Sequence, residues 1–209
     1  MYSEKVHFEL TRRCLLECPK CPRTDLKGNM QITDLPVDAV KTVIQTGNYK
    51  KVLLSGNLGD PIYHPKLIDI IKFFDTQNVF FIMATNGSGK KLDWWKEFYN
   101  SYTHGKVVFG VDGLKNTAHM YRKNIDFDSS MAAMKLGAIL GKDIVWQFIP
   151  FSFNEHQIET AKQIAKDNQI EFRIRLGNRW SGPNDPLRPK NKDYSIWSAQ
   201  YKDKGYDKV

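Results

Sequence analysis

All the cysteines of the chain fall within eight consecutive positions. Cys14, Cys18 and Cys21 have C-x3-C-x2-C spacing, and the other positions of the 209-residue sequence contain no cysteine. Spacers this short let one loop bring three thiols to one metal centre, and Pro19 and Pro22 disfavour a helix through that loop. Thiolates suit both zinc and iron–sulfur clusters. We therefore predict a metal-binding loop.

Two other interpretations of the cysteines are open to test. A disulfide with one spare thiol is disfavoured by the odd number of cysteines, and by an N-terminus without the pattern of a secretion signal. A zinc site completed by His7 or another side chain would make the chain a non-catalytic interaction module. The sequence has no apolar run near the roughly 20 residues that span a bilayer, so we expect a cytoplasmic protein without a membrane partner.

The formal charge of +8 raises the question of a nucleic-acid partner. Basic residues are scattered among acidic ones instead of forming a block, which is typical of a solvated surface. A hydrophobic content of 41% is enough for one sizeable core. Nucleic acid stays possible as a partner, but the charge pattern gives it weak support.

Strand patterns and helix patterns alternate six times along the chain. This alternation predicts a parallel sheet with right-handed crossovers. A full eight-unit barrel needs roughly 250 residues, so we expect an α/β fold, a partial (β/α)6 TIM-like barrel in a single domain, with a doubly wound sheet as the alternative. The strands are expected at 4–10, 51–54, 79–83, 106–111, 143–149 and 170–176.

Helices are expected between these strands, at 36–46, from about 65, at 92–99, at 128–140 and from 154. Asn154 and Gln157 have the spacing of a capping box. Met131 and Met134 have helical spacing and are expected to fill the core. Residues 1–176 would form the core domain. Residues 177–209, rich in Pro, Asn, Asp and Lys, would form a tail that is irregular or packed across the barrel, with a short helix possible at 194–201.

Polar residues follow the strands, where βα folds place their chemistry. The turn after the second strand contains Gly56, Asn57, Gly59 and Asp60, whose glycines allow close backbone approach and whose carboxylate suits an ammonium. Each such residue can also be an ordinary turn or surface residue. The remaining candidates at or beyond later strands are Asn86, Asp112, Arg122, Gln147 and Leu176.

Taken in chain order, the cysteine spacing, the Gly56–Asp60 turn, Thr-Asn86-Gly and Asp112-Gly resemble the radical SAM superfamily. The resemblance covers residues 4–176 and is closest to members with a cysteine-rich C-terminal extension, for which this chain has no cysteines left. It departs from the family twice. Lys20 precedes the last cysteine, where an aromatic residue is frequent, and Gly110 replaces the serine of a Ser-x-Asp-Gly motif.

The resemblance implies an enzyme with two cofactors, a 4Fe-4S cluster on Cys14, Cys18 and Cys21 and S-adenosylmethionine (SAM). Reductive cleavage of SAM would give a 5'-deoxyadenosyl radical that abstracts hydrogen from a substrate. A peptide or protein substrate is favoured over a nucleotide or RNA, and flavodoxin or ferredoxin would donate electrons. The resemblance also implies which residues bind SAM. Its amino group would contact the turn with Gly56, Asn57, Gly59 and Asp60, its carboxylate Arg122, its ribose Gln147 and its adenine Leu176. Asn86 and Asp112, the motif residues after the third and fourth strands, complete the implied site.

Overall fold

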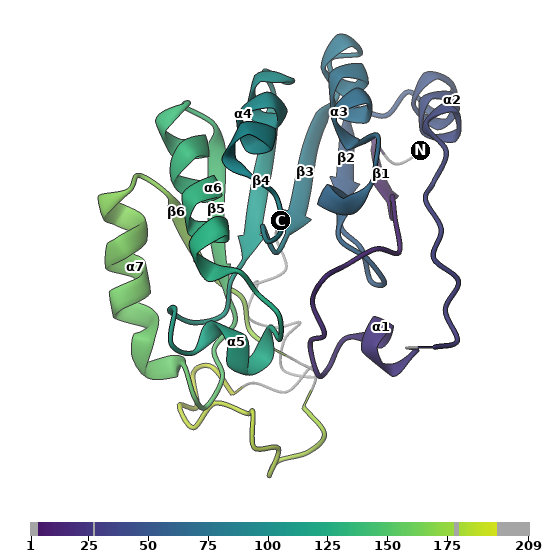
Figure 1. Cartoon of the computed structure of the whole chain (residues 1–209). Coiled ribbons are helices and arrows are strands. Elements are labelled where there is room, and N and C mark those ends of the chain that lie inside the picture. The colour runs from purple at the N-terminus through teal and green to yellow at the C-terminus, as the bar shows by residue number, and fades with distance from the viewer. Residues whose placement is uncertain (1–3, 27, 178–179, 196–209) are drawn as a thin grey trace.

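A computed structural model describes residues 4–26, 28–177 and 180–195. Its six strands form one parallel sheet in the sequential order β1-β2-β3-β4-β5-β6 (Figure 1). The strands are β1 (Lys5–Phe8), β2 (Lys51–Leu54), β3 (Phe80–Thr85), β4 (Gly105–Gly110), β5 (Asp143–Phe148) and β6 (Glu171–Ile174). A doubly wound sheet reverses its strand order at a switch point, whereas each strand here pairs with its neighbours in the chain. The partial TIM-like barrel is therefore confirmed, and the doubly wound alternative is wrong.

Five longer helices follow the strands and cover the sheet (Figure 1). They form because apolar residues recur at helical spacing; in α3, for example, Leu67, Ile70, Ile71 and Phe74 are all buried. The helices are α2 (Val37–Gly47), α3 (Leu67–Thr76), α4 (Leu92–Asn100), α6 (Phe127–Ile139) and α7 (Ile158–Asp167). All six predicted strands and the five predicted helices between them are thus present, with boundaries that agree to within a few residues, and the described residues after β6 contain no helix.

Three short helical turns in the described part of the chain were not predicted: α1 (Pro22–Asp25), η1 (Pro61–Tyr63) and α5 (Ala118–Tyr121). A fourth, η2 (Glu155–Gln157), lies at the start of the helix expected from 154 and leads directly into α7. Pro22 and Pro61 each occupy a first helical position, where the missing N–H has no partner to lose. Residues 14–21 contain no helix, which confirms the expectation for the cysteine loop, and α1 begins at Pro22 immediately after Cys21.

The predicted capping box at Asn154 and Gln157 is wrong, because the Asn154 side chain caps no helix. The Asn154 side chain instead accepts a hydrogen bond from the Phe151 amide at 2.6 Å. Gln157 accepts hydrogen bonds from the Thr117 hydroxyl at 2.5 Å and from the Leu114 amide at 3.0 Å. Both side chains are buried and brace the loops that follow β4 and β5 instead of capping a helix.

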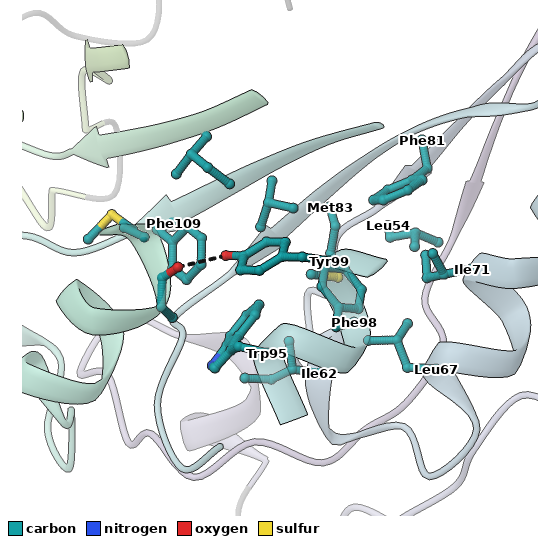
Figure 2. Packing of buried hydrophobic residues seen from close by; sticks show 14 of the residues in the cluster. Leu54, Ile62, Leu67, Ile71, Phe81, Met83, Trp95, Phe98, Tyr99 and Phe109 are labelled. Carbon is teal, nitrogen blue, oxygen red and sulfur yellow. Dashed lines mark hydrogen bonds between the residues drawn. The ribbon is translucent and has the colours of Figure 1, made fainter. Parts of the chain in front are cut away.

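The core lies between the sheet and the helices. Figure 2 shows Trp95, Phe98 and Tyr99 of α4 packed with strand residues such as Phe81 and Phe109. All five side chains are essentially buried, and burying a large apolar side chain contributes about 1.5–3 kcal/mol. The Tyr99 hydroxyl, which would be costly to bury alone, donates to the Ala133 carbonyl at 2.9 Å. Met131 and Met134 are buried in the same cluster, which confirms their prediction as core residues.

Because all strands are parallel, the loops after them meet at one end of the sheet. In Figure 1 the strand arrows point toward this end, where α1 and α5 also lie. Residues 180–195 contain neither helix nor strand. Most of the short helix considered at 194–201 lies outside the described residues. Among the residues that the structure describes, no helix is long and apolar enough to cross a membrane.

Candidate functional site

A cavity of about 180 Å³ lies where the loops meet at the carboxyl ends of the strands. Ten of the twelve predicted site residues line it, although they come from five separate parts of the chain. They are Cys14, Cys18, Cys21, Gly56, Asn57, Gly59, Asp60, Asn86, Arg122 and Gln147. The other two do not line it. Asp112 lies behind Arg122, and Leu176 is buried outside the cavity lining.

The three cysteines are free thiols on the wall of this cavity. The Cys14 sulfur accepts hydrogen bonds from the Leu16 amide at 3.4 Å and the Asn86 side chain at 3.7 Å. Cys18 and Cys21 are joined by a turn in which the Cys21 amide donates to the Cys18 carbonyl at 3.1 Å. The Cys21 thiol donates to the Asn57 carbonyl at 3.8 Å, which joins the cysteine loop to the loop after β2.

Burial keeps two of these thiols protonated in the metal-free protein. It raises the pKa of Cys14 to about 12, with a further contribution from the Asp60 carboxylate. Burial also raises the pKa of Cys18, and the nearby Arg122 guanidinium opposes that rise. A metal ligand must be a thiolate, so binding of a metal or cluster here would release protons.

The donor set fits an iron–sulfur cluster better than a single zinc ion. Zinc in a structural site needs four ligands that converge on one point. Within the described part of the chain, no three cysteine, histidine or acidic side chains converge in this way. The imidazole of His7, the candidate fourth zinc ligand, lies with Nε2 2.5 Å from the Ser55 carbonyl oxygen, to which it can donate. A four-iron cluster instead spreads its thiolate ligands over separate irons, and soft sulfur donors suit it.

Asp60 is the centre of a buried hydrogen-bond network. Its Oδ2 accepts from the Asn86 amide at 2.7 Å, the Asn86 side chain at 2.5 Å and the Thr85 hydroxyl at 3.1 Å, and its Oδ1 accepts from the Ile62 amide at 3.2 Å. Burial raises the pKa of Asp60, and these hydrogen bonds oppose the rise. The carboxylate therefore fixes Asn86 beside Cys14, in addition to any contact it makes with a ligand.

The glycine turn after β2 is packed tightly against the start of the cysteine loop. A Cβ on Gly59 would lie 1.9 Å from the Thr11 carbonyl oxygen, so no other residue fits at this position. The next amide, that of Asp60, donates to the Arg13 carbonyl at 2.9 Å. The sequence suggested that these glycines approach a ligand, but the structure shows at Gly59 a close approach to the cysteine loop itself.

Arg122 and Asp112 form a buried ion pair at the cavity wall. The Arg122 Nε donates to Asp112 Oδ2 at 2.7 Å, with side-chain exposures of 16% and 0%. The second Asp112 oxygen accepts from the Ile149 amide at 2.8 Å. Burial raises the pKa of Asp112, and the guanidinium opposes the rise. Asp112 takes Nε, and no partner among the described residues takes the outer nitrogens of Arg122, which can therefore serve a ligand in the cavity.

Several lining residues were not among the predicted site residues. They are Leu16, Arg23, Ser55, Ala84, Thr85, Val108 and Gly110. Ser55 and Thr85 come at the ends of β2 and β3, so the rule that βα chemistry follows the strands could have found them. Arg23 lies two positions after Cys21, and its place beside the cysteine loop is the signal that could have found it. Three other polar side chains on the loops after β1 and β2 are engaged within the protein: Arg13 with Asp34, Lys20 with Asp185, and the Tyr63 hydroxyl with the Ser88 carbonyl.

This fold and this cavity together define a partial βα barrel with a cysteine loop after β1 and a polar cavity at the carboxyl ends of its strands. The same fold occurs in Streptococcus suis SuiB bound to S-adenosylmethionine, with a TM-score of 0.71, 14% identity, and coverage of 91% of this chain and 44% of SuiB. The fold that the resemblance implied is therefore confirmed.

Two further solved structures match over most of the chain. SuiB bound to its precursor peptide SuiA has a TM-score of 0.69 and 14% identity over 83% of this chain and 39% of SuiB. The protein anSMEcpe with bound AdoMet and Kp18Cys peptide has a TM-score of 0.61 and 16% identity over 89% of this chain and 56% of anSMEcpe. The chain thus spans about half the length of these proteins or less. No family model and no curated protein matches the sequence.

Proposed function

We propose that the chain is a radical SAM enzyme whose cavity at the strand ends holds a 4Fe-4S cluster and SAM. The observation that carries this proposal is the meeting of Cys14, Cys18 and Cys21 with Asn86 and Arg122 on one cavity wall. Three cysteines would bind three irons and leave the fourth iron for SAM. When bound, the cluster would supply the electron for reductive cleavage of SAM to the hydrogen-abstracting 5'-deoxyadenosyl radical.

The residues of the chain would bind and orient the cofactors. Arg122 offers its outer guanidinium nitrogens to the SAM carboxylate, a pairing that planar guanidinium favours. The polar groups of Asn57 and Asn86 would bind the amino end, and Gln147, on β5, would bind ribose. Asp112 keeps Arg122 in place, and Asp60 keeps Asn86 in place. The adenine contact proposed for Leu176 has less support, because Leu176 is not part of the cavity lining.

We further propose a peptide or protein substrate. The support is that SuiB and anSMEcpe, which share the fold, were each solved with a peptide bound. An external donor such as flavodoxin or ferredoxin and a cytoplasmic location belong to the same proposal. A nucleotide or RNA substrate is the alternative, and its support is the formal charge of +8 alone.

Anaerobic reconstitution tests the cofactors. The protein is expected to bind about four irons with equivalent sulfide, and to release 5'-deoxyadenosine when given dithionite and SAM. Cys18→Ala should abolish both results. Arg122→Gln should retain the iron but lose 5'-deoxyadenosine, whereas the matched control Arg173→Gln, on β6 beside Glu171, should retain both. A colourless protein with one zinc per chain would overturn the proposal in favour of an interaction module.

Substrate class can be tested in the same assay. A substrate is expected to accelerate 5'-deoxyadenosine formation and to acquire a mass change. A peptide pool and an RNA pool are added in parallel, and deuterated members of the active pool should transfer deuterium to 5'-deoxyadenosine. Acceleration by RNA but not by peptides would contradict the substrate part of the proposal and leave the cofactor part intact.

A further inference from the structure

Lys20 joins the cysteine loop to a segment more than 150 positions away. Its ammonium lies 2.9 Å from Asp185 Oδ2 and 2.5 Å from the Ser181 hydroxyl, across a separation of 165 residues from Asp185. Lys20 lies between Cys18 and Cys21, so the contact falls in the turn that holds two predicted cluster ligands. The Lys20 side chain is 26% exposed and that of Asp185 only 2%.

Asp185 is the centre of the turn that it belongs to. Its Oδ2 also accepts from the Ser181 amide at 2.7 Å, and its Oδ1 accepts from the Leu187 amide at 3.0 Å. The backbone closes around the same residue, because the Asp185 amide donates to Gly182 and its carbonyl accepts from Arg188. A buried carboxylate with this many donors is ionised, and Lys20 supplies a positive charge for it.

Residues of segment 180–195 also pack against Cys18 of the cysteine loop. Trp180 and Leu187 pack in a cluster with Tyr121, Phe151 and Cys18. The Ser152 amide donates to the Leu187 carbonyl at 3.1 Å, so the segment is also tied to the loop after β5. Farther along, Glu155 accepts from the amides of Lys190 and Asn191 at 3.1 and 3.0 Å.

We propose that Lys20 is a positioning residue that, through Asp185, fastens segment 180–195 over the turn between Cys18 and Cys21 and so shields Cys18 from solvent. Without the Lys20 ammonium, the buried carboxylate of Asp185 has no counter-charge and is more stable when exposed to water. The turn around Asp185 then separates from the cysteine loop. Cys18 then loses the cover of Trp180 and Leu187. The role of Lys20 in shielding a thiol stands by itself. Its role in protecting a cluster rests on the proposed function.

Thiol alkylation of the metal-free protein tests the shielding. In Lys20→Met the rate at Cys18, followed by peptide mapping with iodoacetamide, is expected to rise by about tenfold or more, because breaking a buried ion pair frees the segment. The charge effect alone has the opposite sign, since loss of a nearby cation disfavours the reactive thiolate. Faster alkylation therefore reports exposure and cannot come from electrostatics.

Three companion variants sharpen the measurement. Lys20→Arg should keep the wild-type rate, because the guanidinium can also pair with Asp185. Adding Asp185→Asn to Lys20→Met should bring the rate back toward wild type, since no buried charge is then left unpaired. The matched control Lys142→Met removes a lysine whose ammonium bonds the Tyr102 carbonyl instead, and Cys18 should not respond. An unchanged or slower rate in Lys20→Met would overturn the proposal.

Reconstituted protein provides a second readout. The Lys20→Met cluster is expected to lose its visible absorbance in air several times faster than wild type and to show an altered electron paramagnetic resonance signal when reduced. Lys20→Arg should restore both. If wild-type protein took up no iron, the proposed function would fail, while the alkylation rates would still decide whether Lys20 shields Cys18.

Discussion

The guanidinium of Arg122 fills the space that a side chain at Gly110 would occupy. Its Nη2 lies 2.6 Å from the position of a Cβ on Gly110. The absence of a side chain at Gly110 allows Arg122 to lie between its partner Asp112 and the cavity. The glycine at position 110 and the position of the Arg122 guanidinium therefore depend on each other.

Gly110→Ala should displace Arg122. The added methyl group forces the guanidinium off its pairing geometry, which should lower the free energy of unfolding by about 1–3 kcal/mol. It should also weaken SAM binding to the reconstituted protein, measured by equilibrium dialysis. Gly182→Ala is the control, because a Cβ there meets nothing within 4 Å. Unchanged stability and unchanged SAM affinity in Gly110→Ala would show that Arg122 moves aside freely.

Arg122→Met should destabilise the protein by about 3–5 kcal/mol, because it leaves the fully buried Asp112 without its counter-charge. Adding Asp112→Asn should recover more than half of this loss. The neutral amide can still accept from Ile149 through its oxygen. Urea unfolding of the two single variants and the double variant gives the coupling energy directly. Additive losses would contradict the ion pair as the source of the effect.

Asp60→Asn should lower the free energy of unfolding of the metal-free protein by about 2 kcal/mol or more. The new NH2 group would face donors on Asn86 and Thr85 in place of an acceptor oxygen. Urea unfolding without any cofactor measures this loss. If stability were unchanged while SAM affinity fell, Asp60 would act by direct contact with SAM instead of by holding Asn86.

Asp34 should add stability that depends on pH. The Arg13 side chain and the Thr11 hydroxyl hold the pKa of Asp34 below its ordinary value of 3.8. The pKa of Asp34 is lower in the folded than in the unfolded protein. The stability that the ionised Asp34 adds is therefore complete at pH values above the unfolded-state pKa, and it is lost as the pH falls through the folded-state pKa. The Arg13 side chain is half exposed, so solvent weakens the ion pair. We expect the free energy of unfolding of the wild type at pH 7 to exceed that of Asp34→Asn by about 1 kcal/mol.

The pH series decides whether the charge matters. Unfolding of both proteins is followed between pH 7 and pH 3, and the difference between them should shrink toward the acid end. A difference that stays constant across the series would mean that the Asn side chain changes packing and that the charge of Asp34 contributes nothing.

Local sequence patterns were sufficient for the fold and for most of the cavity lining. Apolar periodicity, which depends on near neighbours in the chain, predicted each strand and each longer helix. Parallel order then brought Gly56, Asn86 and Gln147 to one end of the sheet, as expected. Short helical turns such as α1 were missed because four residues are too few to show a helical period.

The sequence by itself determined the βα order, the resemblance to radical SAM core domains and the gathering of three cysteines in one loop. Only the tertiary structure decided which groups the polar side chains pair with. Asp60 meets Asn86 across 26 positions and Lys20 meets Asp185 across 165. A buried charged group pairs with a group that the tertiary fold places beside it. The two partners can lie far apart in the sequence, so sequence spacing does not predict the pair.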